Sequence, residues 1–178
     1  MRKALLLAVI GAVIFPANAQ VQSDKWVMRF KDFNITLPLT WAAVKPLEED
    51  LCDIVGPERK DGSSPRVSIA TIPEDARTDA QIREDVLKNY QGKLNVGTYT
   101  RLTGAVAGLH ALGLDIKFHL KGQPDKRLEE IGFRMIYLII RTPSQKQIYL
   151  IRWSDTDENF QKAKEEANSV INSFHLTH

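Results

Sequence analysis

The four histidines are the first candidates for metal binding, and their positions argue against a shared site. His110 and His119 stand nine residues apart in one extended segment, so their side chains project to opposite faces of a strand. His175 and His178 form an H-x-x-H pattern at the C-terminus, where no cysteine or carboxylate flanks them. Zinc sites require several converging ligands. We therefore interpret the terminal histidines as solvated tail residues and predict no metal site.

The other chemical candidates also have simpler explanations. The acidic runs at residues 48–50 and 129–130 could form an acid/base pair or a calcium site, but neither matches an EF-hand loop. The serines at residues 63–64 lack the G-x-S-x-G context of a hydrolase nucleophile. The glycines of residues 104–108 are not followed by the G-K-[ST] of a phosphate loop. Cys52 has no close basic neighbour, which favours a buried hydrophobe over a reactive thiol. We predict no catalytic residue and no cofactor, and a hydrolase assembled from scattered residues stays an alternative.

The first 19 residues have the order of parts found in a secretion signal. Two basic residues precede an uncharged apolar run over residues 4–15, and small residues stand at positions 17 and 19, before Gln20. The run is shorter than the roughly 20 residues of a membrane-spanning helix, and no lipid-anchoring cysteine follows it. We predict a cleavable signal peptide at 1–19, a single domain over 20–178, no membrane anchor after cleavage, and a periplasmic or secreted location.

The excess of basic over acidic residues lies entirely in this leader. The whole sequence has 24 basic and 22 acidic residues, and the leader carries two of the basic residues and none of the acidic ones. The mature chain is therefore formally neutral. Without a net positive field, binding to nucleic acid loses its main electrostatic support, so we predict no nucleic-acid partner.

Most of the mature chain has the patterns of β-strands. The clearest alternation covers residues 112–120, where apolar residues point one way and Asp115, Lys117 and His119 point the other. Two further segments are apolar on both faces, as central strands are. The predicted strands cover residues 26–30, 34–37, 51–55, 66–72, 98–102, 112–120, 131–140 and 147–153.

Two segments have the patterns of amphipathic helices. The first begins at Thr78, which forms a capping box with Gln81, and ends near Gly92. The second is predicted to have Asp155 as its N-cap and to pack an apolar side on the sheet. The combination predicts an α+β fold, with a mostly antiparallel β-sheet covered by helices.

A family resemblance follows from the order of these segments. The sequence ITLPLTW at residues 35–41, a Gly-Pro turn at 56–57, a helix, a long hairpin and a closing INSF at 171–174 resemble the PsbP-like fold. This α/β/α sandwich is shared by photosystem extrinsic subunits, a yeast Ran-release factor and DcrB-type bacterial envelope proteins. The resemblance covers roughly residues 26–174 and implies a non-catalytic accessory domain that binds proteins. No binding residue of the family can be matched here, and the anchoring cysteine of the DcrB-type lipoproteins is missing.

We therefore predict an exported, non-enzymatic protein-binding or accessory domain, in a sharper version an immunity or inhibitor protein against a toxin or envelope enzyme. The candidate partner-binding residues are Asp115 and Lys117 on the polar strand face, and Glu58, Arg59 and Lys60 in a loop. Two alternatives remain: the hydrolase named above, and a carrier that holds a small apolar ligand between sheet and helix. The partner is expected to be another protein, and the sequence does not predict an oligomeric state.

Overall fold

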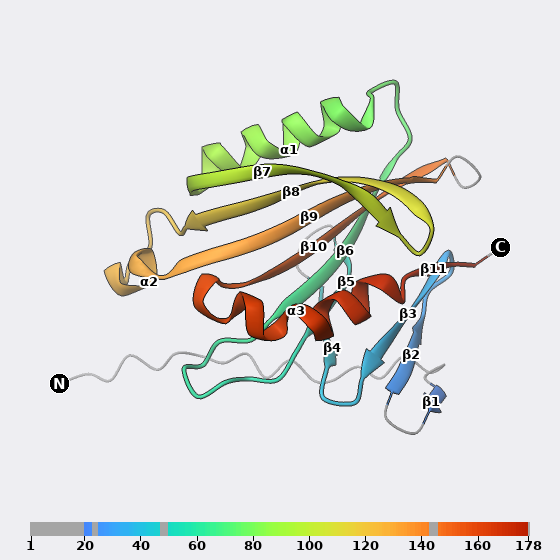
Figure 1. Ribbon diagram of the computed structural model, residues 1–178, viewed down its shortest axis with the longest axis horizontal. Helices are drawn as coiled ribbons and strands as arrows, with labels where there is room; N and C mark the ends of the chain where they lie inside the picture. Colours follow the sequence, from blue (N-terminus) through green and yellow to red (C-terminus); the bar gives the residue numbers. More distant parts are fainter. Residues whose placement is uncertain (1–19, 23–24, 47–49, 143–145, 178) are drawn as a thin grey trace.

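The computed structural model describes residues 20–22, 25–46, 50–142 and 146–177. Within them the chain forms eleven strands and three helices, and the strands make two antiparallel sheets (Figure 1). The predicted signal peptide lies outside the described residues, and so do residues 48–49 of the acidic run.

The larger sheet has seven strands and is the framework of the fold. Its strand order is β4-β5-β6-β10-β9-β8-β7, and every neighbouring pair is antiparallel. In that order the strands are β4 (Ala42–Val44), β5 (Asp50–Val55), β6 (Arg66–Pro73), β10 (Gln147–Thr156), β9 (Gly132–Thr142), β8 (Leu109–His119) and β7 (Asn95–Val106). The long strand β7 therefore forms one edge of this sheet.

The smaller sheet joins the two ends of the described chain. Its order is β1-β2-β3-β11, from β1 (Gln20–Gln22), β2 (Lys25–Arg29), β3 (Phe33–Pro38) and β11 (His175–Leu176). Strand β11 pairs His175 with Asn34. The sheet is thereby held to the C-terminal helix that directly precedes β11.

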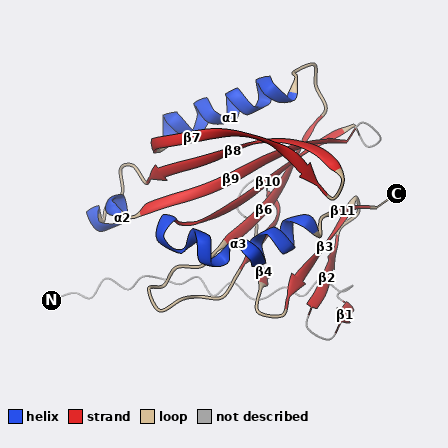
Figure 2. Cartoon of the chain, viewed as in Figure 1, coloured by secondary structure: helices blue, strands red, loops and turns tan. Residues whose placement is uncertain are grey.

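The helices cover both faces of the larger sheet. Helix α1 (Asp79–Lys93) packs on one face, and helix α3 (Asp157–Asn172) packs on the other, while the short α2 (Lys126–Glu130) connects β8 to β9 (Figure 2). The arrangement is an α/β/α sandwich. The predicted α+β fold, a mostly antiparallel sheet covered by helices, is confirmed.

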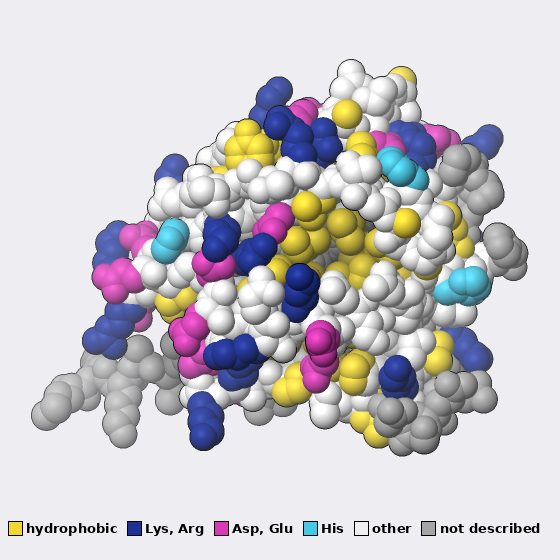
Figure 3. Space-filling model, viewed as in Figure 1, with side chains coloured by type: hydrophobic (Ala, Val, Ile, Leu, Met, Phe, Trp, Pro, Cys, Tyr) yellow, Lys and Arg dark blue, Asp and Glu magenta, His cyan; other side chains and the backbone are white. Residues whose placement is uncertain are grey.

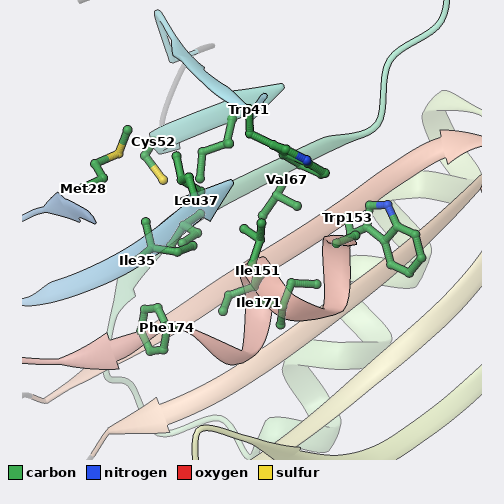
Figure 4. Packing of buried hydrophobic residues seen from close by; sticks show 14 of the residues in the cluster. Met28, Ile35, Leu37, Trp41, Cys52, Val67, Ile151, Trp153, Ile171 and Phe174 are labelled. Atoms are coloured by element: carbon green, nitrogen blue, oxygen red, sulfur yellow. The ribbon is translucent and has the colours of Figure 1, made fainter. Parts of the chain in front are cut away.

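Two apolar clusters, one on each face, hold the layers together. The cluster under α3 is the larger and includes side chains from the small sheet, as Figure 4 shows for Met28, Leu37 and Phe174. All three tryptophans lie in it, each at most 7% exposed. Cys52 is buried in the same cluster and is 3% exposed, which agrees with its interpretation as a small hydrophobe.

The sequence predicted the N-cap of α1 correctly and that of α3 incorrectly. Thr78 is the N-cap of α1 and forms the predicted capping box, with Gln81 N donating to Thr78 Oγ1 over 3.2 Å. The helix continues one residue past Gly92, to Lys93. The prediction for α3 was wrong by one residue, because Thr156 is its N-cap. Asp155 lies in β10 instead, where its carboxylate binds an arginine.

Candidate functional site: an apolar groove beside an edge strand

The predicted strand face at Asp115 and Lys117 is only partly polar. Asp115 accepts two hydrogen bonds from Arg134, at 2.8 and 2.5 Å, and Lys117 Nζ donates to Asp157 over 2.9 Å. Farther along the same face, Ala111 and Gly113 are buried. The opposite face of β8 is dry, as predicted. Its buried side chains are Leu114, Ile116 and Phe118.

The predicted loop residues divide into one internal and two exposed side chains. The guanidinium of Arg59 donates to both carboxylate oxygens of Asp155, at 2.8 and 2.7 Å. This ion pair raises the pKa of Arg59. Glu58 and Lys60 are exposed on either side of it. The loop is held further by Asn159, whose amide nitrogen donates to Asp61 over 2.9 Å.

The structure brings the two predicted patches to the same end of the sheet. Lys117 pairs with Arg134 across β8 and β9, and Arg134 pairs with Asp155 across β9 and β10. Arg59 then reaches Asp155 from the loop. Most of these charges are engaged with one another, so they fasten the loop and the start of α3 to the sheet. Partner binding at these residues stays a prediction.

The histidines and carboxylates do not converge in the described residues. His119 lies beside α2, with its Nδ1 3.1 Å from the carbonyl oxygen of Glu129. No group of three or more metal-ligating side chains is found in the part of the chain that the structure describes. His178 lies outside that part.

The feature that the sequence reasoning missed is an apolar groove between α3 and the strands β7, β8 and β9. Its volume is about 260 Å³. It is lined by Leu102, Thr103, Gly104, Ala105 and Val106 of β7, Ala111 of β8, Ile136 and Leu138 of β9, and Asn168, Ile171 and Asn172 of α3. Apolar side chains gather in a hollow near the middle of the face shown in Figure 3, where Figure 1 places these elements. We call this site the α3–β7 groove.

Small residues on neighbouring strands make room for the groove. Gly104 pairs with Ala111, and Leu102 pairs with Gly113, so these four positions share the face that α3 only partly covers. An alanine Cβ at Gly104 would meet no atom within 4 Å. At Gly113 it would lie 2.5 Å from the carbonyl oxygen of Tyr137. The groove is therefore open above β7, while the backbones of β8 and β9 meet closely in its floor.

The lining of the α3–β7 groove carries no charge. On the same face of the sheet, Asp115 of β8 and Arg134 of β9 form an ion pair, and the Arg134 guanidinium lies 4.6 Å from the centre of the Phe160 ring. The ion pair raises the pKa of Arg134. Asn168 and Asn172 stand one helical turn apart on α3 and are exposed, so the groove has two amides on its helical side.

A second hollow of about 550 Å³ lies at the other end of β7. Its lining is Gln91, Leu94, Asn95, Val96, Gly97, His119 and Lys121. This lining mixes a cation, an imidazole and amides with a few apolar side chains. It does not offer the continuous apolar surface of the α3–β7 groove.

Comparisons with known proteins find similarity in structure alone. No protein-family model and no curated protein sequence matches the chain. The crystal structure of LpqN, involved in cell envelope biogenesis of Mycobacterium tuberculosis, aligns over 82% of this chain and 83% of LpqN, with 12% identity and a TM-score of 0.59. PA94 from Pseudomonas aeruginosa, a protein of unknown function, aligns over 84% of this chain and 94% of its own, with 11% identity and a TM-score of 0.57.

A PsbP protein is also among the similar structures. The solution structure of cyanobacterial PsbP from Synechocystis aligns over 91% of this chain and 98% of its own, with 14% identity and a TM-score of 0.49. The similarity to LpqN and PA94 is one of fold alone, and it agrees with the predicted α/β/α sandwich. Within the described residues, no helix has the length and apolarity needed to cross a membrane.

Proposed function

We propose that this chain is an exported, non-enzymatic protein-binding domain and that its partner docks apolar side chains into the α3–β7 groove. The observation that carries the proposal is the groove itself, an uncharged hollow with Ile136 and Leu138 in its floor. Apolar surface left open on a folded domain is characteristic of an interaction site. A partner that covers it gains by removing these side chains from water.

The size of the groove favours a protein partner over a carried small molecule. Its volume of about 260 Å³ is below the roughly 300–1,000 Å³ of sites that enclose drug-sized ligands. The groove is also bordered by exposed residues of β7 and α3, so a ligand in it would stay in contact with water. An apolar side chain that remains attached to a partner protein needs less enclosure than a free apolar ligand.

Export is supported by the leader pattern and agrees with one structural neighbour. LpqN is described as involved in cell envelope biogenesis. Mass spectrometry of the secreted or periplasmic fraction is expected to find a mature N-terminus at Gln20. Detection of intact Met1 in the membrane fraction would contradict the signal peptide.

Site-specific photo-cross-linking tests the binding site. A photoreactive side chain at Asn172 is expected to form an adduct with one defined partner in the cell that makes this protein. The same group at Lys164, an exposed position of α3 outside the groove lining, is the control. Gly104→Phe should fill the groove and remove the adduct, because the new side chain leaves the backbone on the groove face and meets open space.

The partner captured at Asn172 also separates the versions of the proposal. A toxin or an envelope enzyme that loses activity when bound would support the immunity or inhibitor role. A structural envelope protein would support an accessory role. An adduct pattern that Gly104→Phe leaves unchanged would refute docking in the groove.

A further inference from the structure

Among the residues that the structure describes, no strand pairs with the outer side of β7. Strand β7 ends the strand order of the larger sheet, and most of its twelve residues are exposed. A register shift between Val96 and Tyr99 places a bulge near its start. Bulges, prolines and lysines are the devices that commonly protect a sheet edge from pairing with other strands. From Tyr99 to Val106 the strand has no bulge, proline or lysine, and its pairing with β8 is regular. Its one charged side chain, Arg101, forms a salt bridge with Glu84 of α1.

The open edge borders the groove with its backbone. Five consecutive residues of β7, from Leu102 to Val106, line the α3–β7 groove. Successive side chains of a strand point to opposite faces. Side chains on one face could account for only every second of these five residues. The main chain of β7 must therefore also line the groove. This part of the groove offers peptide N–H and C=O groups beside an apolar floor.

From this juxtaposition we infer that the partner binds as an extended segment, which adds a strand to β7 and places apolar side chains into the groove at alternate positions. The inference rests on the proposed function and specifies how the partner is recognised. Main-chain hydrogen bonds to an edge strand provide affinity without regard to sequence, and pockets for alternate side chains provide specificity.

The chemistry around the groove fits such a segment. The lining has no charged side chain. An uncharged apolar segment can therefore bind there without leaving a buried charge unpaired. Across the groove from β7, Asn168 and Asn172 present amides that can both donate to and accept from a main chain. The one charged side chain of β7, Arg101, is held by Glu84 of α1 through two bonds of 2.9 Å. Charge on β7 therefore does not oppose an incoming strand.

A second copy of this chain would fill the groove poorly. In a symmetric pairing of two β7 strands, each copy would present to the other the residues of its own groove face. That face has Leu102 and Val106, but Gly104 between them has no side chain and Thr100 is polar. An extended segment of a different protein, with large apolar residues at alternate positions, is the better occupant.

The test uses peptides selected on the full chain. A phage-displayed library of random octapeptides is selected against the wild-type chain, and the selected sequences are made as labelled synthetic peptides. Binding is measured to wild type, to Gly104→Phe and to Gly92→Phe. Gly92 is the matched control, because it lies on α1 and a Cβ there also meets no atom within 4 Å. Each peptide is then N-methylated at one amide at a time.

The expected result is an alternating pattern. Methylation of every second amide should weaken binding roughly tenfold or more, because it removes a main-chain hydrogen bond and blocks close approach of the strands. Methylation of the intervening amides should have about twofold effect or less. Gly104→Phe should abolish binding, Gly92→Phe should not, and the peptide should slow amide hydrogen exchange in residues 99–106.

The contrary outcomes separate this inference from the proposed function. Peptides that need the open groove but show no alternation overturn strand addition and leave a side-chain docking site. Failure to select any peptide that Gly104→Phe blocks overturns the extended segment, and the cross-linking experiment then decides the proposed function alone. A wild-type dimer that Gly104→Phe converts to monomer assigns the groove to a second copy and also overturns the inference.

Discussion

Replacing Gly113 with alanine should distinguish the close backbone contact in the groove floor from the open space above β7. A Cβ added at Gly113 would lie 2.5 Å from the Tyr137 carbonyl oxygen and 2.9 Å from Leu138 Cδ2, against 3.4–4 Å for an ordinary contact. The leucine end can move, but the carbonyl belongs to the ladder of β8 and β9. Relief therefore requires the two strands to shift apart.

The magnitude follows from two opposing effects. Overpacking of this kind costs typically about 1–3 kcal/mol. Replacing glycine with alanine returns about 0.4–1 kcal/mol by restricting the unfolded chain. Gly113→Ala should therefore lower the free energy of unfolding by up to about 2.5 kcal/mol, with a middle value of about 1.3 kcal/mol. Gly104→Ala, on the neighbouring strand, meets no atom within 4 Å and should be neutral or stabilising by up to about 1 kcal/mol.

Equilibrium unfolding in guanidinium chloride measures both variants against wild type. The midpoints should move in opposite directions or differ clearly, with an unchanged slope, because neither substitution alters the surface exposed on unfolding. In thermal unfolding, each kcal/mol corresponds to about 2–4 °C for a chain of this size. Equal stability of Gly113→Ala and Gly104→Ala would refute the close approach of β8 to β9 at this point.

Three further perturbations test the core, the ion-pair network and a buried phenol. Phe118→Ala should cost about 3–5 kcal/mol and Lys117→Ala less than about 0.5 kcal/mol in chemical unfolding, and equal costs would contradict the register of β8. Asp155→Asn should cost about 3 kcal/mol, because it leaves a partly buried Arg59 without its counterion, and a change within about 0.5 kcal/mol of wild type would show the pair to be dispensable. Burial, with the negative charge of Asp32, raises the pKa of Tyr149 to about 12. Its stabilising contribution should be complete below the ordinary pKa of about 10 and be lost as the pH rises toward 12. Ultraviolet titration should show one late-ionising tyrosine that Tyr149→Phe removes, and ionisation of all tyrosines near pH 10 would contradict its burial.

The sequence predicted those parts of the fold that depend on local patterns. The capping box at Thr78 and the apolar alternation at Leu114, Ile116 and Phe118 specify an element and its buried face within a few residues of sequence. The strand predicted at residues 98–102 is longer, from Asn95 to Val106. An edge strand has only one neighbour and many exposed side chains, so its pattern is weaker than that of a central strand.

The core also shows where local patterns reach their limit. Leu150 lies in β10, a strand apolar on both faces, yet it is only partly buried. The extent of burial depends on which helix crosses the strand and where, and this is a property of tertiary packing. Asp155 shows the same limit. Its position before α3 suggests a cap, but a loop almost a hundred residues away supplies Arg59 as its partner.

The α3–β7 groove was beyond sequence reasoning for a related reason. Ile136 and Leu138 were interpreted as residues of a central strand covered on both sides. The assumption holds for the face under α1 and fails for part of the other, because α3 packs mainly on β9 and β10 and covers β7 and β8 only partly. The signal that could have indicated the groove is the alternation of small residues at Gly104, Ala111 and Gly113, which share one face only once the strands are paired.

The small residues in the groove lower the stability of the domain, and a purely structural role does not explain this loss. A larger apolar side chain at Gly104 would have open space to occupy and would bury apolar surface of the groove, and such burial contributes about 25 cal/mol per Å². Glycine in a strand is also less stable than alanine by roughly 0.5–1 kcal/mol. A chain that needed only stability would gain from filling this space. Stability given up at one place in a fold is typical of a functional site. The open groove and the outer edge of β7 meet at Gly104. A partner that binds there would bury the apolar surface and pair with the main-chain groups that the isolated domain leaves exposed to water.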